Sequence, residues 1–314
     1  MRYAWAMRDQ IAQWIPAPVS YWAGILAAAA KNWLQSQAFI YAAALAFFTV
    51  FSIAPIMIVV VAVVGLVLGE RAAKGELMGQ LEEVLGPEAA EVVQTAVVNS
   101  QIEQSGILPT LVGIVAIVIG ATTVFAQMQR SLNQIWDVVP RPSRSSLWIF
   151  VKARVLSLTI VLAIGFVLMV SLLLSVAMRM VMEFADQWLP MPGWGMVGME
   201  ILISLTVITL LFAAIFKILP DVVLRWRDVL AGALITAILF TVGRSLIAMY
   251  LANTATASTY GAAGSLALLL LWVNYSSLIL LYGAAVTRAH LEARNKPIVP
   301  RNTAVCVHRE LIED

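Results

Sequence analysis

Arg244 is the side chain whose surroundings most restrict what it can do. It stands in the apolar run ILFTVGRSLIAMYLAN, a setting typical of a membrane span. A charge inside a bilayer costs at least about 2.5 kcal/mol even on insertion scales, so such residues usually face a cavity or a partner. A guanidinium group suits a phosphate or carboxylate, because its N–H groups match two oxygens at once. The alternative is that Arg244 snorkels outward or pairs with carbonyls at a helix break.

Few carboxylates are placed to balance this charge. Glu200, near the start of the apolar segment 197–216, is the closest by depth, and none lies deeper in another apolar segment. An arginine without such a partner favours an anionic ligand over a salt bridge. Asn274 and Tyr275 in the last apolar segment, with Gln127, complete the predicted substrate-binding set. These amides and hydroxyls can equally serve to join helices.

Pro55 interrupts another apolar run, FFTVFSIAPIMIVV. Proline removes a backbone hydrogen bond and bends a helix, and Ser52 is placed to bind the carbonyl freed one turn back. Breaks of this kind persist in membranes where neighbouring groups satisfy the backbone. Ser52 and Pro55 therefore predict either a bent helix alone, or a hinge or half-helix that lines a cavity.

The segment QMQRSLNQIW, residues 127–136, is amphipathic and rich in amides. One interpretation is an interfacial helix anchored by Trp136, since tryptophan prefers the level of the lipid headgroups. The other interpretation is a cytoplasmic gate formed by four side chains of this segment. These four are Gln129, Arg130, Asn133 and Trp136.

Catalysis and cofactor binding have little support in the sequence. There is no HExxH, GxSxG or P-loop motif, and no GxGxxG placed after a strand. The single cysteine, Cys306, and the histidines His290 and His308 do not have metal-ligand spacing. Lysines and arginines stay near the ends of apolar segments rather than forming a platform for nucleic acid. We therefore expect no enzyme activity, no metal, no cofactor and no nucleic-acid partner.

Membrane helices are the elements that must position these residues. Hydrophobic residues make up 61% of the chain and charged residues 12%, whereas soluble domains carry roughly 25% charged residues. A surface so poor in charge needs a bilayer as its solvent. A spanning helix needs about 20 mostly apolar residues. The segments that qualify predict an all-α bundle of six transmembrane helices: Ala38–Gly69, Ile107–Gln127, Val155–Met178, Val197–Phe216, Val229–Leu251 and Ser265–Thr287.

Basic residues at the segment ends set the predicted orientation. Six spans place both termini on one side, and that side holds almost all of the 20 lysines and arginines. The opposite side has only Arg71, Lys74 and Arg179, and Arg244 lies within a span. Because short basic loops remain in the cytoplasm, both termini are predicted to be cytoplasmic.

Three further parts flank or interrupt the six-span domain of residues 38–290. Residues 1–37 are rich in tryptophan and predict an amphipathic helix, from about Val19 to Leu34, lying in the membrane plane. Residues 70–106 combine glutamates with apolar residues at helical spacing, which predicts a short helical cap on the non-cytoplasmic side. One interpretation is a cap that packs on the bundle with its glutamates solvated, and the other is a lid over an outward-facing cavity. Residues 291–314 are predicted to form a cytoplasmic tail.

Several motifs, in order along roughly residues 20–295, resemble the YihY/BrkB family of membrane proteins. They are AALAFFTVFSIAPI, QRSLNQIWDV, ILPDVVLRWRDVLAGAL and STYGAAGSLALLLLWVNYSSLILLYGAAV. The resemblance implies a six-helix, multi-pass protein of the bacterial inner membrane. Members are linked with serum resistance as a virulence trait, and one branch with export of a lipopolysaccharide precursor. The family was once labelled ribonuclease BN, a tRNA-processing activity now credited to an unrelated soluble protein.

One position departs from the family pattern. Many members read Gly-Ala-Glu near the end of the sixth span, whereas this chain reads Gly283-Ala284-Ala285. The resemblance therefore does not extend to any mechanism that uses this carboxylate, such as proton coupling.

The leading hypothesis is a membrane transporter or lipid translocase for an anionic amphiphile, with membrane lipids as partners. Arg244 would bind the headgroup, Pro55 would shape the cavity, and residues 70–106 would cover its outer mouth. The first alternative is an envelope-assembly scaffold without transport. The second is a membrane ribonuclease, for which no metal-ligand or acid–base set is present in the sequence.

Overall fold

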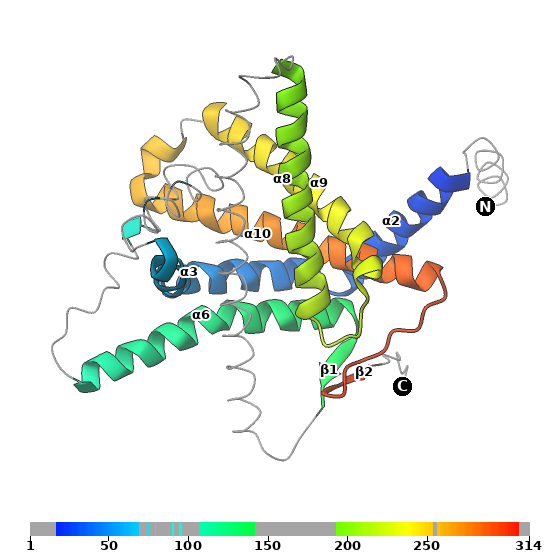
Figure 1. Cartoon of the computed structure of the whole chain (residues 1–314), viewed down its shortest axis with the longest axis horizontal. Coiled ribbons are helices and arrows are strands. Elements are labelled where there is room, and N and C mark those ends of the chain that lie inside the picture. The colour runs from blue at the N-terminus through cyan, green and yellow to red at the C-terminus, as the bar shows by residue number, and fades with distance from the viewer. Residues whose placement is uncertain are drawn as a thin grey trace.

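The computed structural model describes residues 17–68, 107–141, 193–253 and 256–307, and the isolated positions 75, 79, 90, 94 and 95. These residues are almost entirely helical (Figure 1). The elements in chain order are α2 (Ala17–Gln35), α3 (Ala38–Leu68), α6 (Ile107–Ile135), β1 (Val138–Pro140), α8 (Gly193–Ile218), α9 (Trp226–Asn253), α10 (Thr256–Ala293) and β2 (Ala304–Cys306).

Most of the predicted spans are present as helices. The first, second, fourth, fifth and sixth correspond to α3, α6, α8, α9 and α10. The predicted third span, 155–178, lies outside the described residues, as does the predicted cap, 70–106, apart from the isolated positions above. The predicted helix near Val19–Leu34 is present as α2.

Within the described residues, three segments are long and apolar enough to cross a membrane. They are Ile201–Ile218, Trp226–Leu246 and Leu266–Ala293. A fourth is obtained if α2 and α3, which meet at an angle of 67°, are counted as one bent span. The structure thus supports a helical membrane protein, and the number of six spans stays a prediction.

Helix α10 is the centre of the described structure. It packs against α2, α3, α6 and α9, while α8 packs against α9 and α3 packs against α6. Figure 1 shows α3, α6 and α10 lying alongside one another, with α8 crossing them. Residues on every side of α10 are consequently buried, among them Leu281, Ala284, Ala285 and Val286.

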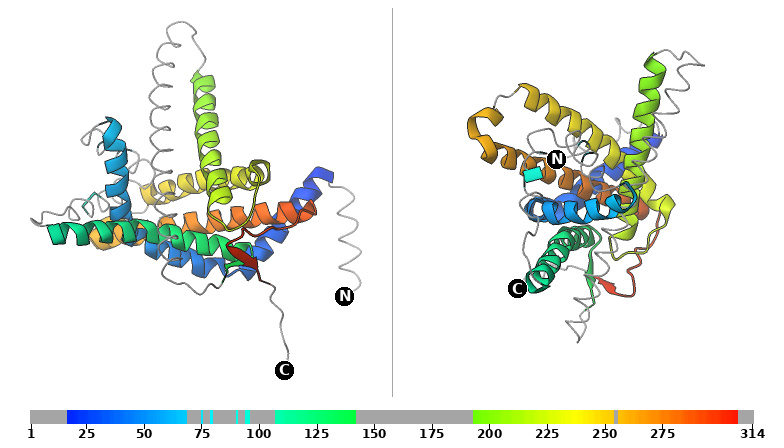
Figure 2. Two further views of the ribbon diagram at one scale, coloured as in Figure 1. Left: turned by 60° about the horizontal axis from the view of Figure 1, so that its bottom comes forward. Right: turned by 60° about the vertical axis from the view of Figure 1, so that its left-hand side comes forward.

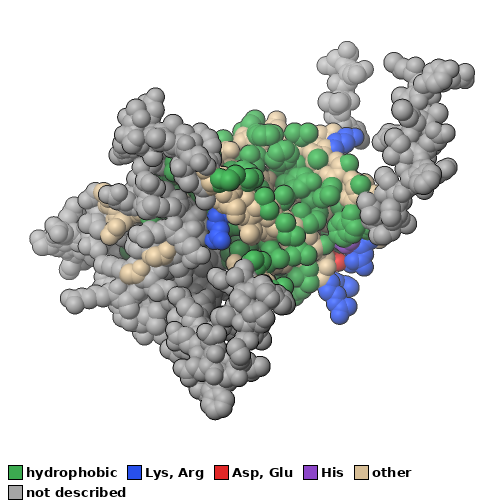
Figure 3. Space-filling model, turned by 90° about the horizontal axis from the view of Figure 1, so that it is seen from above, with side chains coloured by type: hydrophobic (Ala, Val, Ile, Leu, Met, Phe, Trp, Pro, Cys, Tyr) green, Lys and Arg blue, Asp and Glu red, His purple; other side chains and the backbone are tan. Residues whose placement is uncertain are grey.

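Apolar side chains cover the outside of the helices. On α9 every fourth residue from Trp226 to Leu246 is apolar and exposed, and at 1.5 Å per residue this row is about 30 Å long. That length matches the hydrocarbon core of a bilayer. Figure 3 shows hydrophobic side chains spread over one face of the described residues. We call this set the α9 apolar row: Trp226, Leu230, Leu234, Ile238, Val242 and Leu246.

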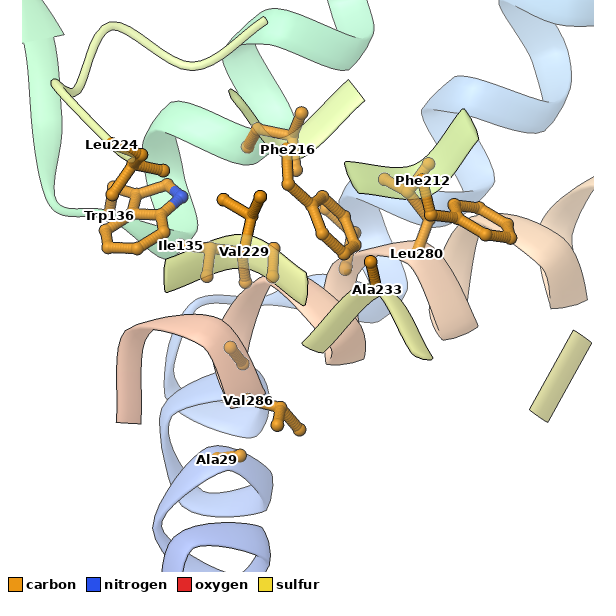
Figure 4. Close-up of a cluster of buried hydrophobic side chains, with 14 of the residues drawn as sticks. Ala29, Ile135, Trp136, Phe212, Phe216, Leu224, Val229, Ala233, Leu280 and Val286 are labelled. Carbon is orange, nitrogen blue, oxygen red and sulfur yellow. The ribbon is translucent and has the colours of Figure 1, made fainter. Parts of the chain in front are cut away.

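The main buried cluster lies where α6, α8 and α10 end and α9 begins. We call this the basic end, because its exposed side chains include Arg130, Arg225, Arg227 and Arg294. Figure 4 shows side chains from α2, α6, α8, α9 and α10 meeting there. The largest of those that are almost fully buried are Trp136, Phe216, Leu132, Ile135, Leu281, Val222, Val229 and Val286.

A small antiparallel sheet, which the sequence did not predict, fastens the segment after α10 to the end of α6. Val138 pairs with Cys306 and Pro140 pairs with Ala304. Asp137 adopts a left-handed backbone conformation with a φ of 49°, which ends α6 and turns the chain into β1. The Val307 N–H then donates to the Asp137 carbonyl at 2.8 Å. Within the described residues, the structure is therefore all-α except for this short two-stranded element and one isolated bridge between Val222 and Pro300.

Helix α2 packs on α10 rather than standing apart from the bundle. The Trp33 indole N–H donates to the Leu278 carbonyl at 3.2 Å, and the Trp22 ring stacks on His290 with centroids 5.3 Å apart. Gln37, with a φ of 56°, forms the corner between α2 and α3. These contacts settle the position of α2 against α10, and the prediction that it lies in the membrane plane stays untested.

Helices α9 and α10 approach each other through small residues. A Cβ on Gly232 would lie 2.0 Å from the Thr287 hydroxyl and 2.7 Å from the Gly283 carbonyl. On the other side, a Cβ on Gly283 would lie 1.7 Å from the Thr236 hydroxyl. Small residues at such crossings let membrane helices pack backbone to backbone.

We predict that Gly232→Ala destabilises the protein by about 1–3 kcal/mol, because the added methyl group meets the backbone of α10. Thermal unfolding of the detergent-purified protein measures this effect. Gly198→Ala on α8 is the control, since a Cβ there meets nothing within 4 Å and alanine is the better helix former. Equal unfolding temperatures for the two variants would contradict the close α9–α10 contact.

Candidate functional site

Two regions of the described structure bring polar side chains together within the helical bundle. The first is at the level of Arg244 on α9, and the second is at the basic end.

Arg244 is half-buried within the candidate span Trp226–Leu246. The neighbouring Gly243 is buried beneath the ring of Tyr275 on α10, because a Cβ on this glycine would lie 2.2 Å from the Tyr275 hydroxyl. Tyr275 is therefore at the level of Arg244 across the α9–α10 contact. Arg244 also has an interaction partner within the protein.

Tyr275 belongs to a polar stretch of α10. Asn274 beside it is half-buried, and the Ser276 hydroxyl is buried without a hydrogen-bond partner among the described residues. Trp272 and Phe240 form an aromatic wall next to Tyr275, with ring centroids 5.5 Å apart between Phe240 and Trp272. A buried hydroxyl without a partner is costly, so it is a candidate for contact with a ligand.

The predicted hinge residue Pro55 packs against a neighbouring helix. The ribbon of α3 changes direction along its length (Figure 2), and Pro55 lies inside this helix. A Cβ on Gly120 of α6 would lie 2.7 Å from Cγ of Pro55, so the proline ring packs directly on the glycine. Ser52 is almost fully buried one turn before the proline. Pro55 is thus supported by α6, and a hinge at this residue stays a prediction.

Gln127 is half-buried on α6, and its carbonyl accepts a hydrogen bond from the Ser131 hydroxyl at 2.9 Å. No described contact joins Gln127 to Arg244. The four predicted substrate-binding residues are therefore not shown as one site, although Tyr275 and Arg244 share one level.

The strongest polar contact at the basic end joins α6 to the loop between α8 and α9. The Asn133 side-chain N–H donates to the Asp221 carboxylate at 2.8 Å, and the Asp221 backbone N–H donates back to the Asn133 side-chain oxygen at 2.8 Å. Gln129 donates to the same carboxylate oxygen at 3.2 Å. Asn133 is 4% exposed and Asp221 is 9% exposed. A buried carboxylate is stable only when its oxygens are bound in this way.

A second polar cluster surrounds Arg288 near the end of α10. Its guanidinium group donates to the Ile135 carbonyl at 2.6 Å and to the Asp137 carboxylate at 2.6 Å. It also donates to Glu292 at 2.8 Å. With its amide oxygen turned toward Arg288, Asn32 of α2 accepts at 3.1 and 3.2 Å. Arg288 thereby satisfies a terminal carbonyl of α6 and ties α2, α6 and α10 together.

The segment after α10 follows the α8–α9 loop. The Arg301 N–H donates to the Asp221 carbonyl at 2.8 Å, and the Arg301 guanidinium donates to the Lys217 carbonyl at 3.1 Å. Lys296 forms an ion pair with the buried carboxylate of Asp228 at the start of α9. Residues 296–301 therefore hold the end of α8 and the start of α9 in place.

The four predicted gate residues all lie at the basic end, but they differ in burial and in hydrogen bonding. Gln129 and Asn133 bind Asp221, whereas Arg130 is exposed. Trp136 is only 1% exposed, so the interpretation of Trp136 as an interfacial anchor is wrong. Sequence amphipathicity placed it at a membrane surface, but the α8–α9 loop covers it, with Leu224 and Val222 in the same buried cluster.

Asp221 and Arg288 were not selected from the sequence. The spacing of Arg288 and Glu292, four residues apart on a helix, was the one local signal available. For Asp221 the partner amides lie 88 and 92 residues away, which no local pattern reports.

Among the described residues, no three histidine, cysteine, aspartate or glutamate side chains gather closely enough to hold a metal ion. Ala285, where many relatives were expected to carry glutamate, is fully buried one turn before Arg288. A carboxylate at this position would therefore have faced the interior of the bundle.

Comparison with known proteins identifies relatives over most of the chain. The sequence profile described as "Virulence factor BrkB" matches residues 29–304. UPF0761 membrane proteins of Xanthomonas oryzae pv. oryzae and Xanthomonas axonopodis pv. citri are 29% identical over 269 residues, which is 85% of this chain. The match spans only 60% and 61% of those relatives' own lengths. No solved structure matches the chain.

We predict that Asn133→Ala destabilises the protein by about 1–3 kcal/mol, because it removes a bond from the buried carboxylate of Asp221. Thermal unfolding in detergent measures the change, and Arg130→Ala on the same helix is the exposed control. In a double-mutant cycle, Asn133→Ala and Asp221→Ala are expected to be strongly non-additive. Additive effects would show that the two side chains do not depend on each other.

Proposed function

The chain belongs to the BrkB virulence-factor family, and from this membership we propose that it is a membrane transporter that moves an anionic lipid or similar anionic amphiphile. Its relatives are named membrane proteins, and this chain has apolar helices of spanning length. Because the chain matches about 60% of the relatives' length, we propose this function only for the part of the molecule that they share.

The observation that carries the proposal is the setting of Arg244. A half-buried arginine in a candidate span, at the level of a tyrosine from the neighbouring helix, is a suitable contact for a phosphate or carboxylate headgroup. Asn274 and the buried Ser276 hydroxyl add neutral hydrogen-bonding groups on the same helix as Tyr275. A charged headgroup would need such groups to replace its water.

An amphiphile also needs an apolar route for its chains. The α9 apolar row runs from the basic end up to Leu246, two residues beyond Arg244. An amphiphile whose headgroup binds Arg244 could therefore keep its acyl chains in contact with the surrounding lipid while the headgroup crosses the membrane. Pro55 of α3, packed on Gly120, is the place where we expect the bundle to change shape.

The basic end has the features of a closed gate in this proposal. The Asp221 and Arg288 clusters join α6 to α2, α10 and the α8–α9 loop through buried polar bonds. Opening this end would require the loop to separate from α6, which exposes Asp221 and Trp136 together. Since Ala285 has no titratable side chain, proton coupling through that position is not part of the proposal.

The test uses the purified chain in liposomes with fluorescent phosphatidylglycerol, followed by chemical bleaching of probe that reaches the outer leaflet. We expect the anionic probe to move faster than the matched phosphatidylcholine probe. Arg244→Gln should lower the rate for the anionic probe by about tenfold or more, as loss of one charged hydrogen-bonding group removes about 1.5–3 kcal/mol. Arg244→Lys should retain part of the rate, because lysine keeps the positive charge but cannot donate two parallel N–H bonds to one headgroup as a guanidinium does.

Arg294→Gln is the matched control, since it removes an exposed arginine outside the polar level of Arg244. Its transport rate should equal that of the unmodified chain. Flat traces for the anionic and the neutral probe alike would exclude lipid transport and favour the scaffold alternative. Equal rates for both probes, unchanged in Arg244→Gln, would remove the assigned role of Arg244.

A further inference from the structure

The corner between α8 and α9 combines exposed basic, aromatic and aliphatic groups. Lys217 lies at the end of α8, with its Nζ 4.8 Å from the ring centroid of Trp226 at the start of α9. Trp226 is 48% exposed, and Arg225 and Arg227 on either side are exposed as well. A cation over an indole ring gains electrostatic energy and keeps both groups oriented. We call Lys217, Arg225, Trp226 and Arg227 the α8–α9 corner.

The acidic residues of this corner are not available to balance its charge. Between residues 217 and 228 the only carboxylates are Asp221 and Asp228. Asp221 is buried under the amides of α6, and Asp228 is buried and paired with Lys296. The exposed charge of the corner is therefore entirely positive, and it attracts an anion at the surface.

Apolar groups surround the positive charge in the arrangement that a lipid requires. Ile218 is 44% exposed and Val223 is 60% exposed on the same connection. Trp226 is also the first member of the α9 apolar row, so Leu230 and Leu234 continue from the corner along the helix. One leaflet is about 15 Å of hydrocarbon, which corresponds to about 10 residues of this row.

From this arrangement we infer that the α8–α9 corner is a binding site for one anionic phospholipid of the adjacent leaflet. Its phosphate contacts Lys217, Arg225 and Arg227, and its acyl chain lies along the α9 apolar row. By the positive-inside rule that leaflet is the cytoplasmic one. Charge selects an anionic headgroup, and the continuous apolar row distinguishes a lipid from a soluble anion. This inference does not depend on the proposed transport activity.

The test is native mass spectrometry of the detergent-purified full chain with dioctanoyl phosphatidylglycerol and dioctanoyl phosphatidylcholine. We expect preferential binding of one phosphatidylglycerol molecule. The triple variant Lys217→Gln, Arg225→Gln, Arg227→Gln should weaken phosphatidylglycerol binding by at least about tenfold and leave phosphatidylcholine binding unchanged, given the known attraction of anionic lipids to clustered basic residues.

A matched triple variant removes equal charge elsewhere: Lys31→Gln, Arg141→Gln and Arg294→Gln, which are all exposed. It should bind phosphatidylglycerol as the unmodified chain does. Equal losses in both triple variants would show a bulk charge effect and overturn the site. So would a lack of preference for phosphatidylglycerol in the unmodified chain.

Two further measurements test the apolar part and the kind of partner. Leu230→Ser should weaken binding of dioctanoyl phosphatidylglycerol, whereas Leu210→Ser, an exposed leucine on α8, should not. Unfolding temperatures of all variants confirm that they are folded. If glycerol phosphate or an acidic peptide competes as well as the lipid at equal concentration, the corner recognises charge alone and the lipid assignment is overturned.

Discussion

Asn133 and Asp221 hold each other through two reciprocal hydrogen bonds of 2.8 Å, with Gln129 binding the same carboxylate. The arrangement of the basic end depends on this contact. Asp221 is only 9% exposed, so α6 can separate from the α8–α9 loop only if water replaces the hydrogen bonds that the carboxylate loses. Because the loop also carries Val222 and Leu224 onto Trp136, the polar contact and the apolar core are coupled.

The central position of α10 follows from its small residues and from Arg288. Gly283 lets α9 approach at backbone distance, and Ala284 and Ala285 are buried where larger side chains would separate the helices. Arg288 then binds the end of α6 and, through Asn32, the helix α2. The apolar and charged parts of α10 thus fasten different neighbours, and both act near the basic end.

Two places where an anion could be held lie along the same helix. The α8–α9 corner stands at the beginning of α9, and Arg244 stands near the far end of its candidate span. The α9 apolar row connects their levels with exposed aliphatic side chains. Lipid bound at the corner and an amphiphile bound at Arg244 would therefore meet the same apolar surface, which gives the two proposals a common physical basis without making either depend on the other.

The amino-acid sequence by itself determined the membrane environment and the positions of α3, α6, α8, α9 and α10. Each of these follows from local properties, because apolar length selects the solvent and each helix satisfies its own backbone. Only the tertiary structure decided that Asp221 binds Asn133, that Arg288 caps α6, and that Trp136 is buried. The bonded groups lie 88 and 153 residues apart, so their pairing depends on how distant helices cross, which no local pattern records.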